Sequence, residues 1–276
     1  METGLTGRKC LITGGATGIG FGIARALARE GVHIVAAGLD PVPEAIEELQ
    51  RLSGMAAFLR LDVSSETSAV AMVRQAIELL DGLDLYINNA AWAWHEPITQ
   101  ITSEAYYRTI NTNLSACVWA CREVSRHMIP RRSGSILITG STVRFCPAYR
   151  EASYRISKMG LKMYMETLAI ELAPYGIRVN MLTPGYFRTT LTAPIPPRQE
   201  EILKSSIPLR RPGQPDECGS AAVLLLSDRL SPYTTGCELV VDGGLSLRPL
   251  PLFSDEEILH LNLGGARAPE RDGEKK

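Results

Sequence analysis

The stretch Thr13-Gly14-Gly15-Ala16-Thr17-Gly18-Ile19-Gly20 decides the fold, because it joins an apolar run at 9–13 to a helical pattern at 19–30. Gly14 permits a tight turn, Gly18 lets the backbone approach a pyrophosphate, and Gly20 lets the helix pack on the strand. The free N–H groups at the helix start attract phosphate. Glycines alone are typical of any flexible loop. In the order strand, turn, helix, second strand, they predict a dinucleotide-binding turn.

Apolar runs and helical patterns alternate outward from this turn. Strands are expected at 9–13, 33–37, 57–61, 83–88, 134–139, 177–183 and 238–242, and helices at 19–30, 44–52, 66–80, 104–129, 154–172 and 216–226. Unbroken apolar runs are typical of strands buried on both faces, and helical crossovers make such strands parallel. The pattern predicts an α/β Rossmann fold: a doubly wound, seven-stranded parallel sheet flanked by helices, in a single domain over residues 1–249.

Two segments depart from the alternation. Residues 184–212 are the only long irregular stretch inside the domain, and a stretch of this length favours a substrate lid. Residues 250–276 form a C-terminal extension. Its first half is apolar enough for a short helix that packs at a subunit interface, and its small, charged end is expected to be disordered.

Composition excludes several classes of protein. The chain has 276 residues, of which 45% are hydrophobic and 21% charged, values typical of a globular protein and not of a disordered chain. Its net charge of −1 provides no field to attract nucleic acid or anionic lipid. There is no apolar run of about 18 residues to cross a membrane. The first residues lack the apolar segment of a secretory signal, which predicts a cytoplasmic location.

The six cysteines form no C-x-x-C pair. We expect free, mostly buried thiols. Cys117 and Cys121, four residues apart, fit one helix face, but no His/Cys/Asp cluster has the spacing of metal ligands. The sequence therefore predicts no catalytic metal.

Tyr154 and Lys158 are the first candidates for chemistry, because residues four apart on a helix lie on the same face. A phenol with a pKa near ~10 is a poor proton carrier at neutral pH, and a neighbouring ammonium stabilises its ionised form. We expect Lys158 to lower the pKa of Tyr154, so that the tyrosine exchanges a proton with a carbonyl or alcohol oxygen. Taken alone, a tyrosine and a lysine four apart on a helix are more often a surface pair than a catalytic one.

Further motifs in register resemble those of the short-chain dehydrogenase/reductase family, from about residue 5 to residue 244. The turn reads T-G-x-x-x-G-x-G, Tyr154 and Lys158 give Y-x-x-x-K, and Ser141 precedes Tyr154 by thirteen residues, as in that family. The other matches are Asn113 within Thr112-Asn113-Leu114, the segment Asp62-Val63, the segment Asn88-Asn89-Ala90-Ala91, the P-G-x-x-x-T segment at 184–189, and Val241-Asp242-Gly243-Gly244. Ala91 departs from the family, which usually has glycine there.

The resemblance implies a hydride transfer between a nicotinamide and a carbonyl or secondary alcohol carbon. It implies that Tyr154 is the acid/base, that Ser141 holds the substrate oxygen, that Lys158 also binds the nicotinamide ribose, and that Asn113 binds a water leading to solvent. The expected cofactor set is Gly14, Thr17, Gly18, Ile19, Gly20, Leu39, Asp40, Asp62, Val63, Asn89, Ala90, Tyr154, Lys158, Pro184, Gly185, Phe187 and Thr189. A homotetramer or homodimer built through the long helices from about residues 104 and 154 is also implied.

The end of the second strand reads the adenosine ribose in this type of fold. Gly38 stands there, followed by Leu39 and Asp40, and Thr17 inside the turn is uncharged. A carboxylate at Asp40 would accept a hydrogen bond from the 2′-hydroxyl and repel a 2′-phosphate, which favours NAD over NADP. An ordinary turn aspartate before Pro41 is the alternative.

The loops beyond the strands select the substrate. Candidate contacts are Trp92, Trp94, His95, Arg144, Tyr149, Arg150 and Tyr186. Tryptophans stack on sugar rings and arginines bind carboxylates, which favours a small polar substrate such as a sugar, polyol, or hydroxy or keto acid. A 3-oxoacyl thioester reductase shares all the motifs and is the first alternative. The second, from another class, is a dinucleotide-binding regulatory protein without turnover.

Overall fold

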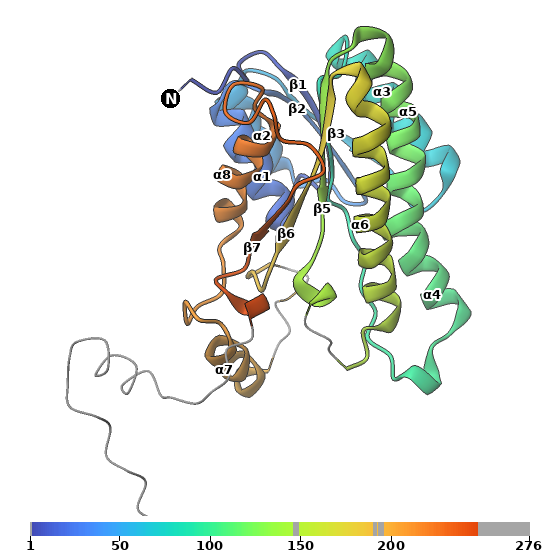
Figure 1. The fold of residues 1–276 in the computed structure, drawn as a ribbon, viewed down its shortest axis with the longest axis vertical. Coiled ribbons are helices and arrows are strands. Elements are labelled where there is room, and N and C mark those ends of the chain that lie inside the picture. The colour runs from blue at the N-terminus through green and yellow to red at the C-terminus, as the bar shows by residue number, and fades with distance from the viewer. Residues whose placement is uncertain (1, 146–148, 190–191, 193–195, 248–276) are drawn as a thin grey trace, which may run out of the picture. The chain divides into compact units, whose positions relative to one another are not determined.

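The computed structural model describes residues 2–145, 149–189, 192 and 196–247 (Figure 1). Seven strands form one sheet in the order β3-β2-β1-β4-β5-β6-β7, and every pair is parallel. The strands are β1 (Lys9–Thr13), β2 (His33–Gly38), β3 (Ala56–Arg60), β4 (Leu85–Asn88), β5 (Gly134–Thr139), β6 (Ile177–Pro184) and β7 (Glu238–Val241). The order reverses between β1 and β4, which confirms the predicted doubly wound sheet.

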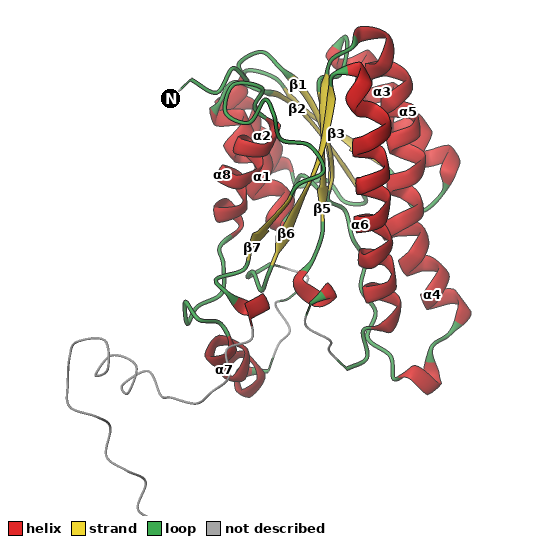
Figure 2. Cartoon of the chain, in the orientation of Figure 1, coloured by secondary structure: helices red, strands yellow, loops and turns green. Residues whose placement is uncertain are grey.

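Helices cover both faces of the sheet (Figure 2). One face carries α1 (Gly18–Arg29), α2 (Pro43–Ser53) and α8 (Pro215–Leu226), and the other carries α3 (Glu66–Leu80), α5 (Ala116–Arg131) and α6 (Ala152–Leu172), with α4 (Ser103–Ile110) leading into α5. Successive strand residues point to opposite faces, so Leu11 joins the core under α3, α5 and α6 while Ile12 joins the core under α1 and α8.

Two elements differ from the sequence expectation. The helix expected at 104–129 is interrupted by a π-helical turn, Asn111–Ser115. The segment 184–212, expected to be irregular, contains α7 (Pro197–Ser206), which begins with a proline at its first position. Proline there costs no hydrogen bond and has the φ of a helix, so a proline-rich segment can start a helix as readily as prevent one. The C-terminal extension at 250–276 lies outside the described residues.

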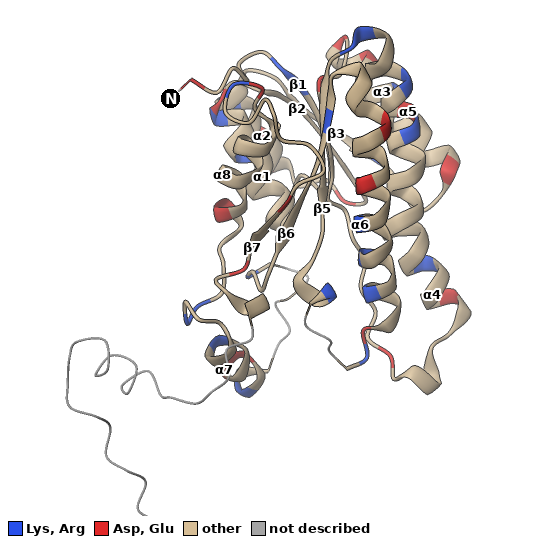
Figure 3. Cartoon of the chain, viewed as in Figure 1, with Lys and Arg blue, Asp and Glu red and all other residues tan. Residues whose placement is uncertain are grey.

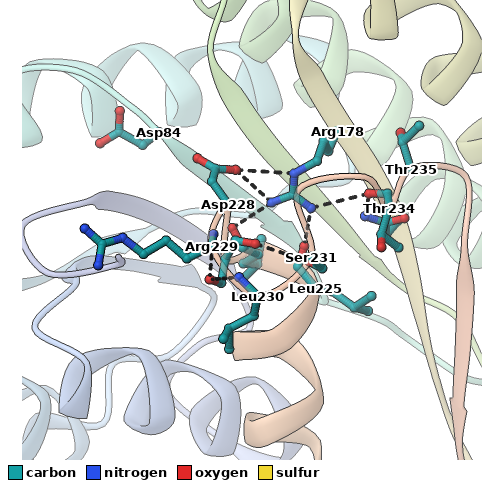
Figure 4. Close-up of polar contacts among 12 residues, drawn as sticks. Asp84, Arg178, Leu225, Asp228, Arg229, Leu230, Ser231, Thr234 and Thr235 are labelled. Carbon is teal, nitrogen blue, oxygen red and sulfur yellow. Dashed lines mark hydrogen bonds and ion pairs between the residues drawn. The ribbon is translucent and has the colours of Figure 1, made fainter. Parts of the chain in front are cut away.

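Most charged residues lie on the helices and loops (Figure 3). Arg178 is an exception, because it lies on strand β6. Its side chain is only 9% exposed. Its guanidinium donates to the carbonyls of Leu225 (2.6 Å) and Leu226 (2.9 Å) at the end of α8 and to the carboxylate of Asp228 (2.9 Å) (Figure 4). These bonds satisfy carbonyls that a helix end leaves unpaired, and they fasten α8 to the sheet.

The cysteines within the described residues are free: Cys10, Cys117, Cys121 and Cys218 are buried and Cys237 is half-buried, while Cys146 is outside those residues. The sulfurs of Cys117 and Cys121 are 3.8 Å apart. Within the same part of the chain, no helix is long and apolar enough to span a membrane.

Candidate active site

The glycine turn lies between β1 and the start of α1, where Gly14 and Gly18 have left-handed φ values of +65° and +53°. A Cβ atom on Gly20 would lie 2.1 Å from the carbonyl oxygen of Gly14, so only glycine lets α1 approach this closely. Thr13 fixes the turn to the end of β4, because its Oγ1 accepts the N–H groups of Asn89 (2.9 Å) and Ala90 (3.0 Å). The turn thus presents the free amides of a helix N-terminus.

The residues expected at the adenosine lie at the ends of β2 and β3. Leu39 and Asp40 are exposed after Gly38, and Asp62 is exposed with its Oδ1 accepting the N–H of Ser64 (2.9 Å), while Val63 is buried. Arg60, which sequence reasoning missed, is paired in register with Gly38. Its Nε donates to the Leu39 carbonyl (3.1 Å).

The nicotinamide end of the expected site follows β6. The Gly185 N–H donates to the Val241 carbonyl (2.9 Å), and Phe187 is buried. A Cβ atom on Gly18 would lie 3.3 Å from the Thr189 side chain, so the structure brings Thr189 against the glycine turn. The turn, the β4 end and this segment together form a strip of glycines and backbone amides that fits a dinucleotide.

Tyr154 and Lys158 lie on one face of α6, and the Lys158 ammonium is 5.6 Å from the centre of the Tyr154 ring. Lys158 is 2% exposed and its Nζ donates to the Thr139 carbonyl at the end of β5 (3.0 Å). Burial lowers the pKa of Lys158 to about 8. The lysine therefore reaches the carboxyl edge of the sheet, where Ser141 follows β5.

The pKa of Tyr154 differs in direction from the sequence expectation, which had Lys158 lowering it. Burial raises the pKa of Tyr154 to about 12; the hydrogen bond with Ser141 lowers it and the nearby Glu151 carboxylate raises it further. The reason for the difference is that the Lys158 ammonium is directed to the Thr139 carbonyl, and burial penalises the charged forms of both residues.

Asn113 lies in the π turn and is fully buried. Its Oδ1 accepts the N–H of Trp92 (2.7 Å), and its Nδ2 donates to the Trp92 carbonyl (2.9 Å) and to the Ser157 Oγ (3.1 Å). The Ser157 hydroxyl in turn donates to the Tyr154 carbonyl (2.7 Å). Asn113 thereby ties the loop after β4 to the helix that carries Tyr154 and Lys158.

The loop after β4 carries an aromatic stack. The rings of Trp92 and Trp94 are parallel with centroids 5.8 Å apart, and the Arg108 guanidinium lies 4.8 Å from the Trp92 ring. His95 Nδ1 is 3.9 Å from a carboxylate oxygen of Glu151, and Arg150 Nη2 donates to the His95 carbonyl (2.9 Å).

Four further side chains complete the comparison with the sequence. Tyr149 is exposed and Tyr186 is half-buried. Arg144 is not at the surface: its side chain is 7% exposed and paired with Glu238 of β7. Glu151 was missed because a single glutamate before a helix has no sequence signal. Its Oε2 is buried without a hydrogen-bond partner, and burial raises the pKa of its carboxyl.

Across the described residues, no group of three or more His, Cys, Asp and Glu side chains is arranged to hold a metal ion. The site's fixed groups are instead a phenol, a hydroxyl, an ammonium and an amide beside the glycine strip. Such a set suits proton exchange with an oxygen next to a bound dinucleotide, which supplies or accepts the hydride.

Known proteins resemble this chain over most of its length. A family model described as enoyl-(acyl carrier protein) reductase matches residues 14–246. The 3-oxoacyl-(acyl-carrier-protein) reductase of Chlamydia pneumoniae is 34% identical over 89% of this chain and 100% of its own. The 3beta-hydroxysteroid dehydrogenase 1 of Eggerthella lenta is 32% identical over 90% of this chain and 97% of its own. The glucose 1-dehydrogenase 2 of Bacillus subtilis is 32% identical over 91% of this chain and 100% of its own.

Among solved structures, a putative short-chain alcohol dehydrogenase from Sinorhizobium meliloti 1021 superposes with a TM-score of 0.86 at 31% identity, covering 90% of this chain and 100% of that one. The named activities of these relatives differ in substrate and agree in being oxidoreductions. The chain therefore belongs to the short-chain dehydrogenase/reductase family and is an NAD(P)-dependent oxidoreductase.

Proposed function

We propose that this enzyme interconverts a ketone and a secondary alcohol on a small polar substrate, with Tyr154 as the acid/base. The observation that carries the proposal is the convergence of Tyr154, Ser141 and buried Lys158 at one end of β5, with Asn113 bracing α6. The bound dinucleotide is the hydride carrier. In reduction the Tyr154 hydroxyl gives its proton to the carbonyl oxygen, and in oxidation the phenolate takes it back.

The other three residues support that proton transfer. The Ser141 hydroxyl donates to the substrate oxygen and keeps it in reach of Tyr154. The Lys158 ammonium stabilises the phenolate and binds the nicotinamide ribose. Asn113 fixes the Trp92 backbone and maintains the proton path to solvent. The positive charge of an oxidised nicotinamide is the group best placed to offset the raised pKa of Tyr154.

The side chains of the loop after β4 favour a ring-shaped or polyhydroxylated substrate. Trp94 is 54% exposed and extends the Trp92 stack toward solvent, which offers a flat apolar face beside the polar groups of His95 and Arg150. Arg144 is buried in an ion pair with Glu238, so its guanidinium does not face a substrate carboxylate. A sugar or polyol is therefore favoured over a keto acid, in keeping with the glucose dehydrogenase among the relatives.

A 3-oxoacyl thioester substrate remains the second candidate, because the reductase of Chlamydia pneumoniae acts on such a compound by its name. An acidic carrier protein would need basic residues around the lid. Two of them are already paired, Arg188 with Glu200 (2.6 Å) and Arg211 with Glu217 (2.6 Å). This pairing weakens the candidate relative to a free small molecule.

We propose NAD as the preferred cofactor, because Asp40 is exposed at the end of β2 and Thr17 in the turn is uncharged. Arg60 is the group that opposes this preference, since a guanidinium favours a 2′-phosphate. The affinities of NADH and NADPH for the wild type, Asp40→Ala and Arg60→Ala decide the point. Asp40→Ala should reduce the ratio of the NADPH Kd to the NADH Kd. An unchanged ratio would show that Asp40 does not contact the adenosine ribose.

The experiment that tests the function is a nicotinamide absorbance assay at 340 nm with NADH/NAD⁺ and NADPH/NADP⁺ in parallel. Sugars, polyols, hydroxy acids and acetoacetyl thioesters are the substrates, and Tyr154→Phe is the control. Turnover of a polyol or sugar that Tyr154→Phe lacks supports the proposal. Turnover confined to the thioesters favours the second candidate, and dinucleotide binding without any turnover favours a regulatory protein.

A further inference from the structure

A buried ion pair lies beside the proposed active site and outside its known machinery. It joins Arg144, in the 3-10 turn Thr142–Arg144 after Ser141, to Glu238 at the start of β7. Their side chains are 7% and 13% exposed. The two residues are 94 positions apart in the chain, so the pair crosses from the loop after β5 over β6 to β7.

The same carboxylate reaches the other flank of Ser141. Glu238 Oε1 also accepts a hydrogen bond from the Thr183 Oγ1 (2.6 Å). Thr183 Oγ1 lies where a side chain on Gly140 would be, 2.5 Å from a Cβ built there, and the Gly140 N–H donates to the Leu182 carbonyl (2.7 Å). Glu238 is therefore bonded to Arg144 just after Ser141 and to Thr183, which packs against Gly140 just before it.

Ser141 itself is coupled to this turn. Its Oγ accepts the N–H of Val143 (3.3 Å), and its carbonyl accepts the N–H of Arg144 (3.3 Å). A displacement of Arg144 would move both contacts and with them the hydroxyl. The hydroxyl has little freedom of its own, because Ser141 is only 9% exposed.

Stability alone does not account for the pair. Burying two charges costs desolvation that their attraction often fails to repay, and apolar residues of similar volume are frequently as stable. Arg144 carries a further cost, because its Nε is buried without a hydrogen-bond partner. The pair costs desolvation free energy and contacts the residues on both sides of Ser141. We therefore explain it by its effect on the position of the Ser141 hydroxyl.

We propose that Glu238 is a positioning residue for the reaction: through Arg144 and Thr183 it holds the Ser141 hydroxyl where it meets both Tyr154 and the substrate oxygen. The inference rests on the proposed function, because it assumes that Ser141 and Tyr154 act on the same oxygen. It assigns Arg144 to the enzyme's own framework and not to the substrate.

The proposal has a signature that a purely structural pair lacks. Tyr154 is influenced by the Ser141 hydrogen bond, which lowers its pKa, by Glu151, which raises it, and by the Lys158 ammonium 5.6 Å from its ring. If Ser141 loosens, the lowering influence is lost while the raising ones stay. The pKa of Tyr154 then rises, and alcohol oxidation, which needs the phenolate, shifts to higher pH.

The test compares Glu238→Gln, Arg144→Met and their double variant with Arg178→Met. The double variant removes both charges, so it guards against a single variant that fails to fold. Arg178→Met is a matched control, because it removes another buried arginine that is paired with a carboxylate, the half-exposed Asp228, away from Ser141. For each protein, kcat, the KM of the dinucleotide, the pH profile of oxidation and the Tm are measured with the best substrate from the 340 nm panel.

We expect both single variants and the double variant to lose about tenfold or more in kcat, as misplaced reacting groups do, while the KM of the dinucleotide is unchanged. The double variant should be no worse than the single ones, because all three break one device. The alkaline shift of the pH profile should appear in these variants and not in Arg178→Met. A Glu238→Gln enzyme with a lowered Tm but the kcat and pH profile of Arg178→Met would overturn the inference.

A measurement without substrate separates this inference from the proposed function. In protein labelled with ¹³C at the tyrosine Cζ, Tyr154→Phe identifies the Tyr154 resonance. Glu238→Gln should move that resonance and Arg178→Met should leave it in place. If Tyr154→Phe keeps full turnover, the proposed function fails, but the Tyr154 resonance still reports on the contact between Ser141 and Tyr154. If Glu238→Gln leaves this resonance in place, the inference is wrong, whatever the turnover.

Discussion

At Lys158 and Tyr154, burial opposes the charges that proton transfer uses. The pKa of Lys158 falls to about 8 and that of Tyr154 rises to about 12. Both shifts disfavour the ammonium–phenolate state in the protein by itself. Burying these two groups lowers the free energy of unfolding of the protein without its ligands. The site is therefore an example of activity that costs folding stability.

The lowered pKa of Lys158 predicts a pH-dependent change in stability for Lys158→Met. Below pH 8 the lysine is charged in both the folded and the unfolded state, and its burial destabilises the fold. Between pH 8 and 10.5 the unfolded chain holds more protons, so wild-type stability rises with pH. The variant should therefore be more stable than the wild type by about 1–3 kcal/mol at pH 7, and this advantage should shrink toward pH 10.

Urea denaturation at pH 7 and pH 10 measures the difference, with turnover recorded in parallel. Lys158→Met should be inactive at both values. A variant that is less stable than the wild type at pH 7 would show that the hydrogen bond to the Thr139 carbonyl outweighs the cost of burying the charge.

Some site residues could be predicted from the sequence and others could not. Tyr154, Lys158 and Ser141 could be predicted because their spacing is local or set by one strand and one loop. Arg144 was predicted at the substrate, because its partner Glu238 lies 94 residues further on and no local pattern reveals it. Separation in the sequence also hides the contact between Glu151 and His95, which meet only once the loops after β4 and β5 are folded.

At the scale of elements, the π turn decides which asparagine serves the site. Five residues, Asn111–Ser115, widen the helix between α4 and α5, and Asn113 points into the protein from this turn. Such turns often occur at functional sites, because the extra residue per turn re-aims a side chain. The sequence predicted Asn113 through family resemblance but predicted an unbroken helix, since no composition signal distinguishes a π turn from an α turn.

Asn113→Ala should cost about 1–3 kcal/mol of stability, because it leaves the Trp92 N–H and carbonyl without partners. It should also lower kcat, since the Trp92 loop and α6 lose their link. Asn111→Ala is the matched control two residues away, where the side-chain oxygen accepts a hydrogen bond from the Ser115 hydroxyl (3.3 Å). Chemical denaturation and the 340 nm assay measure the stability and kcat of both variants. Equal losses of stability and kcat in Asn111→Ala and Asn113→Ala would contradict the positioning role of Asn113.

The strands and most helices followed from the sequence, because apolar runs bounded by glycines leave few alternatives in a parallel sheet. The helix α7 did not, since Pro196 and Pro197 suggested a break where they instead form a helix start. Its side chains are half-buried or exposed, so no apolar stripe indicated it either.

For the whole molecule, Arg178 links β6 to the end of α8 and to the segment beyond it (Figure 4). Arg178→Met should lower the free energy of unfolding by about 2–4 kcal/mol, because it leaves the buried carbonyls of Leu225 and Leu226 without their donor, while Asp228 is half-exposed and keeps its ion pair with Arg8 (3.0 Å). Activity at a temperature where the variant is folded should stay near the wild-type value. A stability within 1 kcal/mol of the wild type would show that water satisfies these groups.

The outer surface of α6 bears on assembly. Ile156, Met159, Met163 and Ile170 are exposed, with solvent-exposed fractions of 44–76%, and their spacing places them on one face of the helix. We propose that this face joins subunits in a homodimer or homotetramer. Met163→Glu should then reduce the mass measured by light scattering to that of a smaller species, whereas Tyr233→Glu, at a fully exposed apolar site on another segment, should not.

The central claim is that Tyr154 transfers the proton in an NAD(P)-dependent oxidoreduction, and Tyr154→Phe tests it most directly because only one oxygen atom is removed. The measurement is steady-state turnover at 340 nm for the wild type and the variant, together with the dinucleotide Kd of each. We predict a loss of turnover of at least about 100-fold with the Kd changed by less than about threefold. A variant that keeps turnover within a few-fold of the wild type would contradict the account.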